Sequence, residues 1–262
     1  MYHYILMAKK RSRSRARRSR RRSKRASSKG HTLPVLSEDK QYNIFIICKT
    51  KKIFDEKVAS MSRYQRKIHS FHYVKAVFLK MNAENFQKTK KLKTRYNTSM
   101  KARIRKLGCI YAHRNALRKI VKLKTENNLI LEEDATLAHL LPNPPGESTY
   151  LGGWIVPKKV TLAGKQKVTV PKLKRGLNEI NFDKIKILMT HSYFVKDTET
   201  ARTILKVIQS KDPIKNYDIF LNDYEFMHKF YYPAIFVQES HVSDIDGKVN
   251  KNEERSRNYD LN

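Results

Sequence analysis

The net positive charge of this chain lies entirely in its first half, and this distribution limits what each half can fold into. Residues 1–37 contain 13 Lys and Arg with no acid, and residues 49–124 contain 23 against three acids. Residues 125–262 contain 19 of each sign, so the formal net charge of +32 lies wholly before residue 125. Because self-repulsion of this size disfavours a compact state, we expect a permanent polyanionic partner for the basic half and an ordinary neutral domain in the other.

The N-terminal run KKRSRSRARRSRRRSKRASSK, residues 9–29, has almost no apolar surface to bury. The sequence therefore predicts a disordered basic tail over residues 1–37. Guanidinium groups bind phosphate with two parallel hydrogen bonds, so we expect sequence-independent contact with nucleic acid. The predicted contacts in the tail are Arg11, Arg13, Arg15, Arg17, Arg18, Arg20, Arg21, Arg22, Lys24 and Arg25.

In composition, residues 9–29 resemble the protamine-like arms of virion proteins from DNA viruses, and also Arg/Ser-rich nuclear proteins. The resemblance implies a tail that engages packaged nucleic acid, and it covers no part of residues 38–262. A nuclear localisation signal is an alternative interpretation of the same run. A mitochondrial transit peptide is another, although the Leu, Phe and Ile of an amphipathic helix are missing. Met7 is an alternative start to Met1.

A basic, mainly helical region is predicted for residues 38–142, after a buried strand at 43–48. Ser62 and Gln65 have the spacing of a capping box, which predicts a helix from about residue 62 to 81. Its apolar stripe would be Met61, Tyr64, Ile68, Phe71, Phe78 and Met81. This helix would place His69 and His72 on one face, where packing or phosphate contact explains them better than a metal does.

A second basic helix is predicted to begin near Ser99. Its buried side would consist of Met100, Ile104, Leu107, Tyr111, Leu117, Ile120 and Val121, with Gly108 marking either a break or a close packing contact. Its polar side carries cations without acidic partners one turn away, which favours phosphate contact over a merely solvated face. Anionic lipid is the rival partner, but the apolar side lacks Trp and the tail is richer in Arg than a membrane anchor requires. The predicted nucleic-acid contacts here are Lys101, Arg103, Arg105, Lys106, Arg114, Arg118, Lys119 and Lys122.

The neutral half is predicted to be a small α+β domain over residues 143–240, followed by a polar tail over 241–262. Residues 129–141 are expected to form one more helix before the Pro-rich linker at 142–146. Strands are expected at 154–156 and 186–195, with a hairpin of 160–162 and 167–170 around a four-residue loop. A helix is expected at 198–209, capped by Asp197 or Thr198, and the aromatic segment 217–237 is expected to be core rather than a stacking surface.

No motif of a nucleotide-binding loop, serine hydrolase, zinc protease or calcium loop is present. Cys48 and Cys109 are too far apart in sequence for a paired metal-ligand motif, and two cysteines favour a reducing compartment. We therefore assign no catalytic residue, no metal ligand and no cofactor from the sequence. No apolar run is long enough to span a membrane.

These observations predict an α+β protein that is not an enzyme and that binds nucleic acid or another polyanion within a large assembly, beside neighbouring protein subunits. A virion capsid or nucleocapsid component is the favoured interpretation. A cytosolic or mitochondrial ribosomal protein bound to ribosomal RNA is the first alternative, and a nuclear chromatin or RNA-processing factor is the second. The expected location is intracellular: the virion, the ribosome or the nucleus.

Overall fold

The computed structural model describes residues 41–90, 92, 99–162, 165–168, 172–189, 191–210 and 216–239. Both predicted tails lie outside these residues, and so do all ten nucleic-acid contacts predicted between Arg11 and Arg25. The described part contains both helices and strands, which confirms the α+β expectation at this coarse level. None of its helices is long and apolar enough to cross a lipid bilayer.

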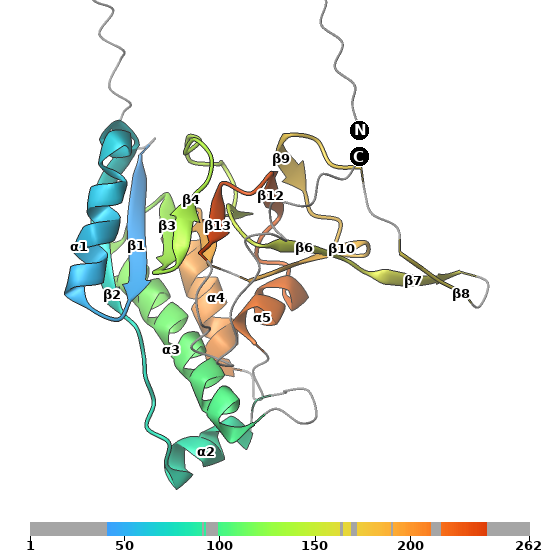
Figure 1. Ribbon diagram of the computed structural model, residues 1–262, viewed down its shortest axis with the longest axis horizontal. Helices are drawn as coiled ribbons and strands as arrows, with labels where there is room; N and C mark the ends of the chain where they lie inside the picture. Colours follow the sequence, from blue (N-terminus) through green and yellow to red (C-terminus); the bar gives the residue numbers. More distant parts are fainter. Residues whose placement is uncertain are drawn as a thin grey trace, which may run out of the picture. The chain divides into compact units, whose positions relative to one another are not determined.

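The central element is a seven-stranded mixed sheet in the order β2-β1-β3-β11-β5-β12-β9 (Figure 1). Its strands are β1 (Tyr42–Cys48), β2 (Ile68–Lys75), β3 (Asn128–Glu132), β5 (Thr149–Tyr150), β9 (Gly176–Glu179), β11 (Ser192–Val195) and β12 (Lys229–Tyr232). β1 is parallel to both β2 and β3, and β11 runs antiparallel to β3. Strands on both sides of residue 142 therefore belong to one sheet.

Three two-stranded ladders complete the β structure. They are β10 (Ile185–Leu188) with β6 (Trp154–Pro157), β13 (Phe236–Gln238) with β4 (Ala135–Leu137), and the hairpin β7 (Lys159–Leu162) with β8 (Lys165–Val168). The strand at 154–156 and the hairpin are confirmed, although the second hairpin strand begins at Lys165, which pairs with Leu162, and not at residue 167. The expected strand at 186–195 is instead two strands, because Met189 between them has a φ of 65°, which interrupts extended backbone.

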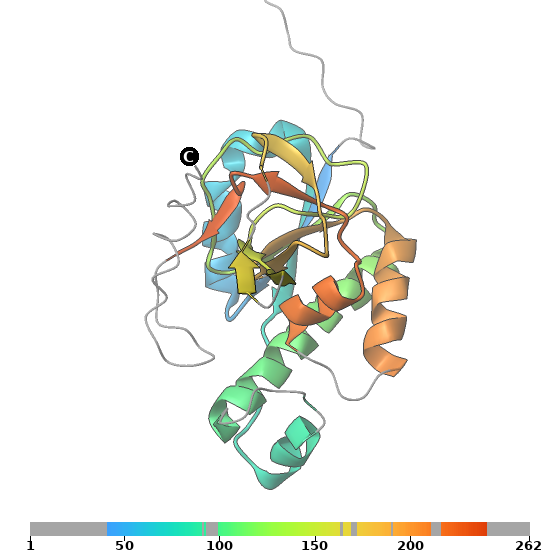
Figure 2. The same ribbon diagram turned by 90° about the vertical axis from the view of Figure 1, so that its right-hand side faces the viewer.

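Helices cover both faces of the sheet at β1, and this strand is therefore buried on both sides. Ile44 and Ile46 pack on one face with α1 (Lys51–Ser60), and Phe45 and Ile47 pack on the other with α3 (Met100–Leu123). α4 (Thr198–Ser210) lies beside α3, α5 (Tyr217–Asp223) adds to the same core, and α2 (Ala83–Lys90) contacts α3 (Figure 2). A 3₁₀ helix, η2 (Ser62–Lys67), precedes β2.

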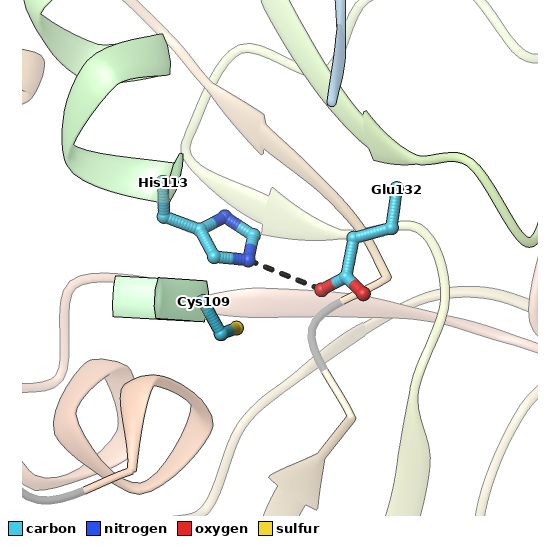
Figure 3. Close-up of side chains that lie close together, drawn as sticks. All are labelled: Cys109, His113 and Glu132. Atoms are coloured by element: carbon cyan, nitrogen blue, oxygen red, sulfur yellow. Dashed lines mark hydrogen bonds and ion pairs between the residues drawn. The ribbon is translucent and has the colours of Figure 1, made fainter. Parts of the chain in front are cut away.

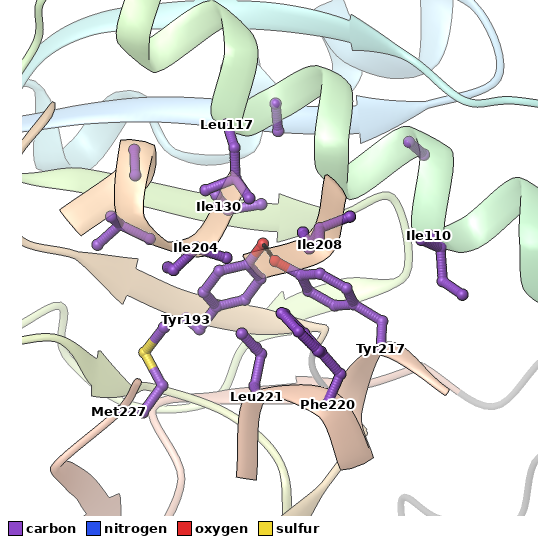
Figure 4. Packing of buried hydrophobic residues seen from close by; sticks show 14 of the residues in the cluster. Ile110, Leu117, Ile130, Tyr193, Ile204, Ile208, Tyr217, Phe220, Leu221 and Met227 are labelled. Carbon is purple, nitrogen blue, oxygen red and sulfur yellow. Dashed lines mark hydrogen bonds between the residues drawn. The ribbon is translucent and has the colours of Figure 1, made fainter. Parts of the chain in front are cut away.

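The core between α3, α4 and the sheet confirms several expectations from sequence (Figure 4). The four residues predicted to face inward from α4, namely Ala201, Ile204, Leu205 and Ile208, are buried, and Asp197 caps that helix through the Thr200 amide at 2.7 Å. The aromatic segment 217–237 also supplies buried core side chains, among them Tyr217, Phe220, Phe230 and Phe236.

Two predicted helices are wrong. Residues 68–75 form β2, so His69 and His72 lie on a strand, where His72 stacks on Phe45 at 4.5 Å between ring centroids. Residues 129–141 form β3 and β4. The two errors have different causes. In β2, an edge strand, Ile68, Phe71 and Val74 recur at three-residue steps and so imitate the spacing of a helix, whereas β3 is a continuous buried apolar run without the alternation of a half-exposed strand.

The second basic helix is confirmed, with Ser99 as its N-cap through a 3.2 Å bond from the Ala102 amide. Its buried side is wider than predicted, because α3 packs against both the sheet and α4. Ile110, Ala112, His113 and Ala116 are buried in addition to the central predicted residues, whereas Met100 is 48 % exposed.

Candidate functional site

A pocket of about 340 Å³ lies where the carboxyl ends of β1, β2 and β3 meet. The chain leaves β1 through α1 on one face and reaches β3 through α3 on the other, so the connections diverge at β1. Such a switch point opens a crevice at the carboxyl edge of a parallel sheet, and it is where α/β proteins bind ligands. The pocket has the size and position of a small-molecule site.

Acidic side chains enter this pocket from the end of β3. Glu132 is the last residue of the strand, and Glu133 and Asp134 form the turn into β4. Glu133 is held by Lys49, which follows β1: the Lys49 amide donates to Oε2 at 2.9 Å and its Nζ lies 2.9 Å from Oε1. Asp134 accepts from the Gln238 side chain at 2.5 Å.

Helix α3 supplies the opposite wall. Cys109 and His113 lie one helical turn apart and both face the pocket, and Arg105 lies one turn earlier. The helix comes close because Gly108 has no side chain: a Cβ there would stand 2.4 Å from the carbonyl oxygen of Val77.

A buried chain of hydrogen bonds runs inward from the pocket. Glu132 Oε1 lies 3.1 Å from His113 Nε2, and His113 Nδ1 lies 3.0 Å from the Tyr193 hydroxyl. That hydroxyl is in turn 3.0 Å from the Tyr217 hydroxyl, and the His113 ring stacks on Tyr217 at 4.2 Å. These contacts fix the orientation of an imidazole that is only 1 % exposed.

The pKa values of this region respond to burial and to the clustered acids. Burial, followed by the charge of Glu132, raises the pKa of Cys109 well above its usual value. Burial likewise raises the pKa of Asp218 in α5, against hydrogen bonds from the Met189 and Ile219 amides that lower it. Burial also raises the pKa of Tyr193. Each shift disfavours the anion, and burial is the largest cause in all three.

The structure separates the nucleic-acid contacts predicted in α3 into distinct groups. Lys101, Arg118 and Lys122 are exposed, and Arg103 and Lys106 are half-buried. Lys119 donates to the Tyr73 carbonyl at 2.9 Å, Arg114 lies over the Tyr111 ring at 4.3 Å, and Arg105 lines the pocket. Only some of these cations therefore present their charge outward.

Sequence reasoning missed the residues that the pocket brings together. Cys109 and His113 were four apart in a correctly predicted helix, and the run Glu132, Glu133 and Asp134 followed an apolar stretch. Interpreting that stretch as a strand would have placed the acids at the carboxyl edge of the sheet. A comparison with protein-family models finds no match to this chain, and a comparison with curated proteins finds none either.

Proposed function

We propose that this protein is an enzyme whose pocket binds a phosphorylated small molecule of the nucleotide class together with a cation. The observation that carries the proposal is the pocket at the switch point beside β1, which gathers acids, cations, an imidazole and a thiol. This proposal sets aside the expectation of a non-enzymatic protein, which rested on the lack of a sequence motif.

The charges of the pocket support a ligand that arrives with a cation. Lys49 and Arg105 face three carboxylates, those of Glu132, Glu133 and Asp134, so acids outnumber permanent cations. A phosphate entering alone would be repelled by the excess carboxylate. A divalent ion bound between the phosphate and the carboxylates attracts both groups, as it does in phosphoryl-transfer sites.

The other end of the pocket supports a planar, apolar ligand group. Ala76, Val77 and Leu79 line it after β2, and Phe78 beside them is 63 % exposed. An exposed aromatic ring at a pocket mouth offers a stacking surface, and every nucleobase has a face that can use it.

Titration calorimetry of the full chain with ADP, GDP, UDP and CDP, each with and without Mg²⁺ or Mn²⁺, tests the proposal. We expect binding of at least one diphosphate that depends on the metal. Lys49→Gln is expected to weaken it by roughly ten- to a hundredfold, because a hydrogen bond to a charged group contributes about 1.5–3 kcal/mol. Lys52→Gln is the matched control, since Lys52 is exposed and lines no part of this pocket. Failure of all four diphosphates to bind in any condition would refute the proposal.

As a second function, we propose that the chain binds nucleic acid or another polyanion, within a virion or in one of the alternative assemblies named above. What supports it is the acid-free sequence of α3, whose outward stripe includes the exposed Arg118 and Lys122 at four-residue spacing. Together with the Arg/Ser tail, this stripe would give tight, salt-sensitive binding.

The test is a salt titration of binding to duplex DNA, single-stranded DNA and structured RNA. The full chain is compared with a form starting at Leu36 and with an Arg118→Gln/Lys122→Gln variant. We expect a steep salt dependence that the shortened form loses in large part and the double variant in smaller part. Preference for structured RNA in the shortened form would support the ribosomal alternative, and no binding at about 50 mM salt would exclude the second function.

A further inference from the structure

The inner end of the pocket brings together three different metal-ligating groups (Figure 3). The Cys109 Sγ, a His113 ring nitrogen and a Glu132 carboxylate oxygen all lie within 4.8 Å of one another. We propose that these three residues form a binding site for a transition-metal ion of the Zn²⁺ type. The site deepens the proposed function, since it would supply the cation that the pocket needs, but ion binding can be measured without any organic ligand.

The distances fit such an ion after a small adjustment. Zn²⁺ bonds of about 2.0–2.3 Å in tetrahedral geometry place ligand atoms roughly 3.5 Å apart. Glu132 Oε1 and His113 Nε2 are already 3.1 Å apart. Because Cys109 Sγ lies within 4.8 Å of both other ligand atoms, a side-chain shift of roughly 1 Å would bring it to the same spacing.

The backbone places these ligands as metal sites require. Cys109 and His113 are four residues apart on one face of α3, the spacing by which a helix offers two ligands to one ion. Glu132 comes from the neighbouring strand end. Because all three residues also line the pocket, a fourth position would face the ligand, which is the arrangement of catalytic rather than structural zinc sites.

The surroundings of His113 support the same assignment. A ligating imidazole is normally held through its other nitrogen by a hydrogen-bonding group. Here Nδ1 is held by the Tyr193 hydroxyl at 3.0 Å, and Tyr217 holds that hydroxyl and stacks on the ring. Nε2 is consequently directed toward Glu132 and Cys109, which is the direction that ligation needs.

The chemistry of the three donors selects the class of ion. Thiolate and imidazole favour Zn²⁺, Co²⁺ and their neighbours over Mg²⁺ and Ca²⁺, which prefer oxygen ligands alone. Co²⁺ is a useful probe because a cobalt–thiolate bond produces a charge-transfer absorption that a carboxylate site does not. The sequence has only one other cysteine, the buried Cys48 in β1, which provides the matched control.

The experiment titrates metal-free full-length protein with Co²⁺ and then displaces it with Zn²⁺. We expect one Co²⁺ per chain with a thiolate charge-transfer band in the wild type and in Cys48→Ser. We expect the band to disappear in Cys109→Ser, and Zn²⁺ affinity to fall at least tenfold in Cys109→Ser, His113→Gln and Glu132→Gln. Glu132 is at the pocket surface with a 28 % exposed side chain, so Glu132→Gln tests the site even where the buried variants fail to fold.

Three outcomes would overturn the proposal: no stoichiometric ion, a charge-transfer band that persists in Cys109→Ser, or ion affinity unchanged in Glu132→Gln. Tight Mn²⁺ binding that survives both the Cys109 and His113 substitutions would likewise assign the ion to carboxylates alone. Zinc binding without any nucleoside diphosphate binding would leave this site standing and remove the proposed function. Diphosphate binding with Mg²⁺ but without a Co²⁺–thiolate band would support the proposed function and overturn the Cys109–His113–Glu132 metal site.

Discussion

Gly108 of α3 and Val77 after β2 are in backbone contact, with room for a hydrogen but not for a carbon between them. A Cβ on Gly108 would stand 2.4 Å from the Val77 carbonyl oxygen, which belongs to the backbone and cannot rotate away. The contact sets the distance between α3 and the segment 76–79, and both line the pocket.

Gly108→Ala is therefore expected to destabilise the protein by about 1–3 kcal/mol, as overpacking does. The sign of this stability change is informative, because replacing glycine by alanine in a helix without such a contact would stabilise the helix by about 1 kcal/mol. Urea denaturation measures the difference. Gly146→Ala is the control, since a Cβ there would have no neighbour within 4 Å among the residues described, and its effect should stay within about 0.5 kcal/mol. A Gly108→Ala protein as stable as the wild type would contradict the contact.

Removing the Tyr193 hydroxyl from the buried chain of hydrogen bonds behind the pocket should lower the stability of the protein. Tyr193→Phe leaves His113 Nδ1 and the Tyr217 hydroxyl each without a bond that they make at 3.0 Å. We expect a loss of about 1–3 kcal/mol of stability, the cost of leaving buried polar groups unsatisfied.

Tyr42→Phe makes the same chemical change at an equally buried position. The Tyr42 hydroxyl has no hydrogen-bond partner within the described part of the chain. Its removal should be neutral or stabilising when both variants are compared by thermal and chemical denaturation. Equal losses of stability in the two variants would show that the hydrogen bonds linking Glu132 to Tyr217 make no specific contribution to stability.

The cap of α4 predicts a pH dependence on the acid side. Burial acts to raise the pKa of Asp197, but hydrogen bonds from the Thr200 amide and hydroxyl hold it below its usual value. A carboxyl whose pKa is lowered on folding stabilises the protein above its unfolded pKa, near pH 4, and loses that contribution as pH falls through the folded value.

Asp197→Asn should keep most of the cap and lessen the loss of stability below about pH 4, whereas Asp197→Ala should cost about 1 kcal/mol at neutral pH. Circular dichroism melting curves at neutral pH and near pH 3 measure both effects. Glu199→Gln, in the same turn but 75 % exposed, is expected to change neither. Identical acid profiles for the wild type and Asp197→Asn would rule out the assignment.

The Cys48 thiol predicts a pH dependence on the alkaline side. Burial, with a smaller effect from Glu133, raises its pKa from 9.0 to about 11. In the unfolded chain the thiol ionises first, so stability should fall as pH rises from about 9 toward 11.

Two measurements check this prediction. Alkylation of the folded protein near pH 8, followed by mass spectrometry, should leave Cys48 unmodified, while the denatured chain should react readily. Between about pH 8 and 10, Cys48→Ser should lose less stability than the wild type. Rapid modification of Cys48 in the folded state would contradict its burial.

The elements predicted correctly from sequence are those whose local signals agree with their surroundings. α4 has an apolar stripe at Ala201, Ile204 and Ile208 and a capping Asp197, and α3 begins at the capping Ser99. Ile44 to Ile47 form a short apolar run between polar residues, which a buried strand requires. In these segments one face meets one neighbour, so residue spacing is sufficient evidence.

The sequence by itself determined where the charge lies, which segments can bury apolar area and where the main capped helices begin. Those properties depend on residues close together in the chain. Only the tertiary structure decided that residues 68–75 and 128–132 are strands, because parallel pairing with β1 supplies hydrogen bonds to both segments, and the sheet buries β3 although β2 stays a half-exposed edge strand. The candidate site depends on the same pairing, since Cys109 and His113 meet Glu132 only where α3 crosses the carboxyl end of β3. No spacing along the chain encodes a contact that arises from two elements packing on a third.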